Sequence, residues 1–146
     1  MIRYYTAAEI RGIYRRPTGT IYRLASEDGW RRNDDRRRPT LYNGDDVEAT
    51  MTITDDAFLA AIDEVIRLRS EEEERPWIVG ASRWDIAAVL AGHLADVGTT
   101  PVDYPTMPEG VVLAKARKLI LRGLVDGCAC GCRGDFERMA RRGDLT

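Results

Sequence analysis

The sequence predicts a mainly α-helical fold with small β-hairpins, and three observations carry this prediction. Apolar residues recur at helical spacing in several stretches that begin at capping residues and end at glycine or proline. A polar, arginine-rich segment follows the second of these stretches, and a glycine- and cysteine-rich segment follows the last. The order helix, helix, hairpin therefore occurs twice, and an acidic stretch lies between the two occurrences.

The first occurrence begins at Thr6, a capping residue, and its first helix ends before Pro17, which cannot continue a helix. A second helix starts near Thr18 and ends at Gly29, which suits the left-handed conformation found after helices. Trp30 then anchors a polar hairpin. Two helices and a hairpin in this order predict a winged helix-turn-helix module in which the hairpin is the wing.

An acidic helix is predicted next. Thr54 caps it, and Asp55 and Asp56 lie in its first turn, where the helix dipole favours acids. Four consecutive glutamates end it before Pro76, and their carboxylates point around the helix, so we interpret them as a solvated helix end rather than a metal site. The predicted divisions are a first module at residues 1–53, an acidic connecting helix at 54–75 and a second module at 76–146.

The second occurrence of the helix, helix, hairpin order fills the rest of the chain. Ser82 caps a helix that runs through Leu94, and a long loop leads to a last helix that starts near Pro108. One side of this last helix is apolar and another is basic. A strand through 124–125, a tight turn and a return strand through 136–139 complete a second, winged-helix-like module.

Both predicted modules carry residue types that bind DNA. The second helix turns Thr20, Tyr22 and Arg23 outward, and a short helix with such a face can enter a major groove. Arginine binds phosphate through two parallel hydrogen bonds and reads guanine edges. The alternative for the wing is a solvated loop whose arginines pair with the neighbouring acids Asp34, Asp35, Glu27 and Asp28. The predicted basic contacts are Arg16, Arg31, Arg32, Arg36, Arg37 and Arg38 in the first module and Lys115, Lys118 and Arg122 on the last helix.

The first module resembles excisionase and MerR-like winged helix-turn-helix proteins, especially small regulators of actinobacterial phages. The resemblance covers about a third of the chain and lies in TAAEI, GTIYRLASEDGWRR, RRP, LY and DVEAT. It implies that the groove-facing residues are Thr18, Thr20, Tyr22 and Arg23. MerR-type proteins continue into a long dimerisation helix, whereas the acidic helix here is short, so effector sensing is not implied.

The second module is similar, more loosely, to the recognition helix and wing of MarR-type regulators. The residues that carry this similarity are ARKLILRGLVDG followed by GDFERMARRG. It implies that the last helix of the chain reads DNA.

The three cysteines, Cys128, Cys130 and Cys132, lie in one turn. A disulfide framework is not expected in a reducing cytoplasm, but three thiolates this close can bind zinc. The alternative is a tight wing turn whose small cysteines pack partly buried. The candidate fourth ligands are Asp126, Asp135, His93, water or a residue of another subunit.

Several classes of protein are not expected from this sequence. No apolar run approaches the roughly 20 residues of a membrane span, and the amino terminus lacks the apolar core of a signal peptide, so we expect a cytoplasmic protein without a membrane partner. A single histidine, no glycine-rich phosphate loop and no nucleophile elbow argue against an enzyme.

We therefore expect a sequence-specific double-stranded DNA-binding protein, either a phage-type transcriptional regulator or an excisionase-like architectural factor. Its further partner is a second copy of the chain or a phage or host protein, and two modules reading two half-sites as a monomer is the alternative. Two other classes stay open: a protein-interaction adaptor or small terminase-like packaging component, and a metal-dependent enzyme built on the cysteine turn.

Overall fold

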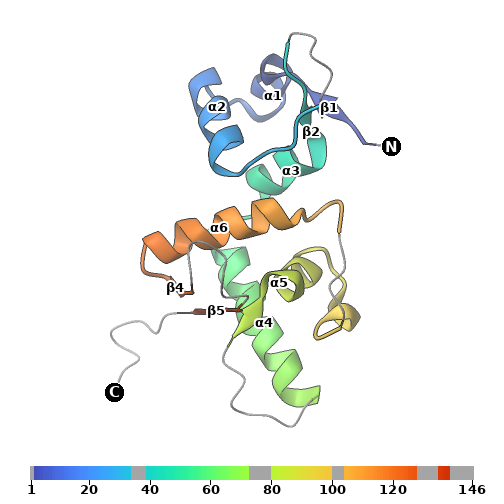
Figure 1. The fold of residues 1–146 in the computed structure, drawn as a ribbon, viewed down its shortest axis with the longest axis vertical. Coiled ribbons are helices and arrows are strands. Elements are labelled where there is room, and N and C mark those ends of the chain that lie inside the picture. Colours follow the sequence, from blue (N-terminus) through green and yellow to red (C-terminus); the bar gives the residue numbers. More distant parts are fainter. Residues whose placement is uncertain (1, 34–38, 73–79, 100–103, 128–134, 139–146) are drawn as a thin grey trace.

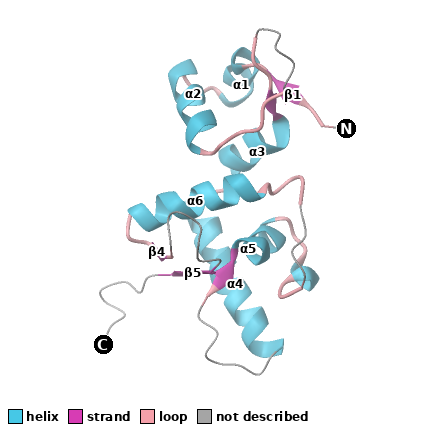
Figure 2. Ribbon diagram, in the orientation of Figure 1, coloured by secondary structure: helices cyan, strands magenta, loops and turns pink. Residues whose placement is uncertain are grey.

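The computed structural model describes residues 2–33, 39–72, 80–99, 104–127 and 135–138 (Figure 1). Within these ranges the chain is mainly helical with two small antiparallel sheets (Figure 2), which confirms the predicted class of a mainly α fold with small β elements. The elements in chain order are β1 (Tyr4–Tyr5), α1 (Ala7–Tyr14), α2 (Thr18–Glu27), β2 (Tyr42–Asn43), α3 (Gly44–Thr52), α4 (Asp55–Glu72), β3 (Ala81–Ser82), α5 (Arg83–Leu90), η1 (Leu94–Asp96), α6 (Glu109–Leu121), β4 (Val125–Asp126) and β5 (Asp135–Arg138). We call β1 to α3 the first unit and α4 to β5 the second unit.

The local signals in the first unit act as the sequence predicts. The Thr6 hydroxyl accepts the Glu9 amide over 3.1 Å, and the Glu9 carboxylate accepts the Thr6 amide over 3.2 Å, which forms a capping box at the start of α1. Gly29 follows α2 with φ of 61°. Trp30 is buried and donates its indole N–H to the Thr50 hydroxyl over 2.8 Å, so it anchors the chain after α2 to α3.

The base of the predicted hairpin is paired. Arg32 lies opposite Tyr42, and the Asn33 amide donates to the Leu41 carbonyl over 2.9 Å. The tip, residues 34–38, lies outside the described residues. β1 and β2 then pair in antiparallel fashion and lead directly into α3.

Gly44, the first residue of α3, lies against β1. Its amide donates to the Arg3 carbonyl over 2.7 Å, and a Cβ at Gly44 would lie 2.8 Å from that oxygen and 2.8 Å from the Tyr5 ring. We expect Gly44→Ala to lower the free energy of unfolding by about 1–3 kcal/mol, the usual cost of overpacking. Chemical denaturation measures this change.

Gly12→Ala is the matched control for Gly44→Ala. Gly12 lies inside α1 and has no atom close to its Cβ position. Alanine there is expected to stabilise the chain by about 1 kcal/mol through helix propensity alone. Similar effects of the two substitutions would contradict the packing argument.

The second unit contains a three-stranded sheet in the order β3-β5-β4, so that the last strand among the described residues, β5, lies in the centre. Ala81 of β3 lies opposite Phe136 of β5, and Val125 of β4 lies opposite Arg138. Phe136 is fully buried, which fixes the sheet on the core of the second unit.

The sequence predicts that residues 54–75 form a helix that connects two modules. In the structure, α4 also packs into the core of the second unit. Phe58, Ile62 and Val65 of α4 are buried, and the helix packs against α5 and β5. Its acids lie on the exposed side, so the helix is amphipathic. The structure therefore assigns α4 to the core of the second unit.

The predicted start of α5 is confirmed, but its predicted end is wrong. The Ser82 hydroxyl accepts the Asp85 amide over 3.1 Å, which caps the helix as expected. The helix ends at Leu90 and does not continue through Leu94, because Gly92 takes a positive φ of 82° that breaks the helical path.

Helix α6 of the second unit is the helix that lies against the first unit (Figure 1). It packs against α3 of the first unit and against α5 of the second. Among the described residues, the buried apolar side chains of both units, apart from Ala114, belong to one hydrophobic cluster. The position of α6 therefore decides how the first unit sits on the second.

Candidate nucleic-acid interface

A groove of about 860 Å³ lies between α1 and α2. Three arginines line it: Arg11 on α1, and Arg15 and Arg16 in the turn that follows. Thr18 and Tyr22 of α2 are also part of the lining. The structure thus brings the predicted residues Arg16, Thr18 and Tyr22 together in one basic groove.

The start of α2 adds positive potential to this groove. Arg15 adopts the left-handed conformation with φ of 53°, which ends α1 and leads the chain to Pro17, the residue before α2. No side chain caps α2 at this end. Its first backbone N–H groups therefore present the positive end of the helix dipole close to Arg16, an arrangement that suits a phosphate group.

The outer face of α2 continues from the groove. Tyr22 is 54% exposed and also lines a second hollow, together with Pro39 and Thr40 of the returning hairpin strand. Thr20 is half-buried, whereas Arg23 is exposed and its guanidinium lies 3.2 Å from the Glu27 carboxylate. Tyr22 therefore stands between the two hollows, with Arg23 one position further along the helix.

The hairpin arginines differ in their surroundings. The Arg31 guanidinium lies 2.8 Å from the buried Asp46 carboxylate, and the Arg31 amide donates to the same carboxylate over 2.7 Å. Arg31 thereby ties the hairpin base to α3. Arg32 is exposed and its guanidinium carbon lies 5.8 Å from the centre of the Tyr42 ring. The predicted contacts Arg36, Arg37 and Arg38 lie outside the described residues.

Arg11 and Arg15 are not among the contacts predicted from the sequence. Both line the groove between α1 and α2. The signal was present in their spacing, because residues four apart fall on one side of a helix, and Arg16 follows directly. The turn at Arg15 then brings this side of α1 against the start of α2.

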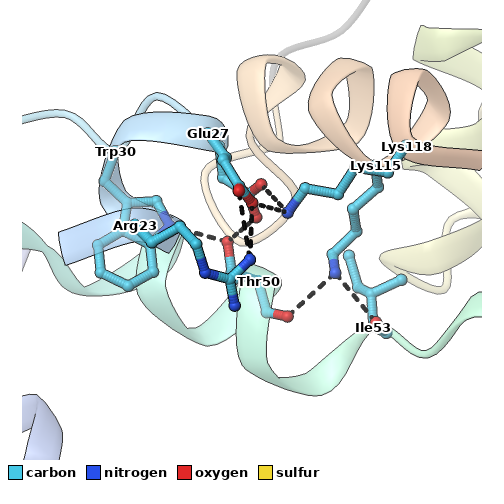
Figure 3. A network of polar contacts seen from close by, with 8 residues as sticks. Arg23, Glu27, Trp30, Thr50, Ile53, Lys115 and Lys118 are labelled. Carbon is cyan, nitrogen blue, oxygen red and sulfur yellow. Dashed lines mark hydrogen bonds and ion pairs between the residues drawn. The ribbon is translucent and has the colours of Figure 1, made fainter. Parts of the chain in front are cut away.

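The predicted basic contacts on α6 and directly after it face acceptors of the protein itself, and Figure 3 shows two of them, Lys115 and Lys118. The Lys115 ammonium donates to the Thr50 carbonyl over 3.0 Å and to the Ile53 carbonyl over 3.1 Å. Lys118 forms an ion pair across the units, and Arg122 pairs with Asp55 at the start of α4. Lys115 and Lys118 are thus engaged within the protein, whereas the Arg122 side chain is 58% exposed beside Asp55, and contacts of these residues with DNA stay a prediction.

The ion pair of Lys118 joins the units through a buried carboxylate. Its ammonium lies 2.7 Å from the Asp28 carboxylate and 3.1 Å from that of Glu27. Asp28 is only 1% exposed, and the Thr50 hydroxyl donates to it over 2.6 Å while accepting from Trp30. One chain of polar contacts thus joins the end of α2, α3 and α6.

The surroundings shift the pKa of three groups in this network. Burial lowers the pKa of Lys118, but the carboxylates of Asp28 and Glu27 beside its ammonium outweigh burial, so the net pKa is raised. Burial lowers the pKa of Lys115. The hydrogen bond from Lys118 lowers the pKa of Glu27. Lys118 and Glu27 therefore stabilise each other in their charged forms.

The cysteine turn and its proposed zinc lie outside the described residues, and the same holds for the Asp135 side chain. In the described part of the chain, no group of three or more histidine, cysteine, aspartate or glutamate side chains is arranged to hold a metal ion. His93, a candidate fourth ligand, packs against the Tyr104 ring at 5.0 Å and lies 3.7 Å from Asp96.

Comparison with known proteins gives no family for this chain. No protein-family model matches it, and no curated protein or solved structure matches it either. Across the described ranges, each helix is too short or too polar to cross a lipid bilayer. The groove between α1 and α2 and its surroundings are therefore the features that point to a function.

Proposed function

We propose that the chain is a sequence-specific double-stranded DNA-binding protein of the winged helix-turn-helix kind, acting as a phage-type regulator or an excisionase-like architectural factor. The observation that carries this proposal is the groove between α1 and α2. Arg11, Arg15 and Arg16 surround the uncapped start of α2, and Tyr22 is exposed beside it. The proposed role requires access to DNA, which the cytoplasm of a bacterial host provides.

The residues of the proposed DNA-binding face have different roles, which follow from their chemistry. Arginines and free backbone N–H groups around the groove bind phosphates and fix the position of the protein on the duplex. Tyr22 and Arg23, on the exposed face of α2, read base edges in the major groove. Arg32 and the hairpin tip contact the neighbouring backbone.

The topology of the second unit supports a winged-helix relationship for that unit as well. Its elements follow the order helix, strand, helix, helix, strand, strand, and its last strand lies in the centre of the sheet. In this arrangement α6 occupies the position of the recognition helix. Its basic residues Lys115 and Lys118 contact the first unit, however, so the DNA face of the proposal consists of first-unit residues.

Selection of bound duplexes from a random DNA pool tests the proposal. We expect the parent chain to enrich a motif and Arg16→Gln to bind the same motif more weakly, with a salt dependence reduced by about one unit of log Kd against log salt, because one phosphate contact is lost. We expect Arg23→Ala to relax the motif, since a good base contact contributes about 1–3 kcal/mol of discrimination.

Arg67→Gln is the matched control for both DNA-face variants. Arg67 lies on α4 in the second unit, where it pairs with Glu64 and Glu71. Its replacement removes the same charge but should leave the motif and the salt dependence unchanged. Salt-sensitive binding without a motif would favour an architectural or packaging role. Absence of binding by the parent would refute the proposed function.

A further inference from the structure

The ends of two first-unit helices meet α6. Lys118 contacts Asp28 and Glu27 at the carboxyl end of α2, and Lys115 contacts the Thr50 and Ile53 carbonyls at the carboxyl end of α3 (Figure 3). The carboxyl end of a helix carries a partial negative charge and unpaired carbonyl groups. Each lysine thus supplies a cation where a first-unit helix needs one.

The composition of the chain makes this contact unusual. The sequence contains twenty arginines and two lysines, and both lysines lie at this contact. A lysine ammonium is compact and donates in three directions, whereas a guanidinium is planar and donates in a fixed fork. The Lys115 ammonium donates to two carbonyls from one half-buried point, which the compact group can do.

We propose that Lys115 and Lys118 are positioning residues that fix the first unit on α6, so that the chain presents one DNA-binding face rather than two. α6 then serves as a docking helix for the chain's own first unit and does not read DNA through these lysines. A DNA site with two half-sites consequently requires two chains. The statement about DNA rests on the proposed function. The contacts of Lys115 and Lys118 with the first unit, which we call the joint between the units, exist independently of it.

The first experiment measures the joint without DNA. Amide relaxation in the full chain gives the rotational correlation time of α1–α3 and of α4–α6 separately. We expect one common value in the parent chain and a shorter value for α1–α3 in Lys115→Gln and in Lys118→Gln. Lys115→Arg keeps the charge but not the shape of the ammonium, and is expected to loosen the joint as Lys115→Gln does.

The second experiment measures the salt dependence of DNA binding by the same variants, with Arg16→Gln as the control for a phosphate contact. Replacing a positioning lysine leaves the slope of log Kd against log salt unchanged. Replacing a lysine that binds phosphate lowers this slope by about one unit. A lysine bound to phosphate would also tolerate replacement by arginine without loss.

Two results would overturn the inference: a common correlation time retained in all three lysine variants, or a loss of slope in Lys115→Gln or Lys118→Gln equal to that in Arg16→Gln. If Lys118→Gln does not fold, the two Lys115 variants carry the test, because they leave the contact with Asp28 intact. If the parent chain binds no DNA, the proposed function fails while the relaxation measurement still decides whether the lysines hold the joint.

Discussion

Lys118→Met is expected to lower the free energy of unfolding by about 3 kcal/mol, the lower end of the cost of removing one partner from a buried ion pair. The Asp28 carboxylate is almost fully buried, and Lys118 is the cation that lies 2.7 Å from it. Methionine keeps much of the side-chain length but leaves the carboxylate with the Thr50 hydroxyl. The value lies at the lower end because the Lys118 side chain is 37% exposed and water can partly replace it. Urea denaturation of the parent chain and of Lys118→Met measures the difference in the free energy of unfolding.

The double variant Lys118→Met with Asp28→Asn tests the cause of this loss. If the cost arises from an uncompensated buried charge, removing that charge as well should restore most of the stability, and the two substitutions should be strongly non-additive. A loss below about 1 kcal/mol for Lys118→Met alone, as for an exposed ion pair, would contradict the buried-pair argument.

Phe58→Ala is expected to lower the free energy of unfolding by about 3–5 kcal/mol, the range for removing a large aromatic side chain from a core. Phe58 lies near the start of α4 and is 1% exposed. Truncation leaves a cavity between α4 and the elements packed on it. Thermal and chemical unfolding followed by circular dichroism measure the loss.

Phe58→Leu is the control for this truncation. Leucine keeps most of the apolar volume, so its cost is expected to stay below about 1.5 kcal/mol. If Phe58→Ala cost no more than Phe58→Leu, α4 would behave as the solvated connector that its acidic sequence predicts, and its assignment to the second-unit core would be wrong.

Helix ends were predictable from the sequence wherever the cause is local. Thr6 and Ser82 cap the helices that they were expected to cap, and Gly29 ends α2 as expected. In each case a side chain or a glycine acts on a backbone a few residues away. Gly92 carried the same kind of signal, but the apolar residues beyond it favoured a longer helix than the one that forms.

The role of α4 was harder to predict because it depends on what covers the helix. Its stripe of Phe58, Ile62 and Val65 was visible in the sequence, and so were its acids. An apolar stripe indicates which side of a helix is buried, but it does not indicate which element that side packs against. The acids led to the interpretation as a connector, although they occupy only the exposed side.

The same limit explains why the basic residues on α6 and directly after it were predicted to contact DNA. Lys115, Lys118 and Arg122 share a region of the helix, and such a region suits either DNA phosphates or acids of the same chain. Asp28 carried the missing signal. An aspartate at the carboxyl end of a helix is unfavourable with the helix dipole, so its presence after α2 indicates that a cation lies nearby.

The scarcity of lysine gives the joint between the units a chemistry that the rest of the chain lacks. Lys115 and Lys118 supply all the side-chain amines of the protein, whereas its arginines, those of the proposed DNA face included, carry guanidinium groups. Acylation of lysine removes the positive charge. An amine-selective reagent or a lysine acetyltransferase would therefore change the contact between the units and leave every arginine unmodified.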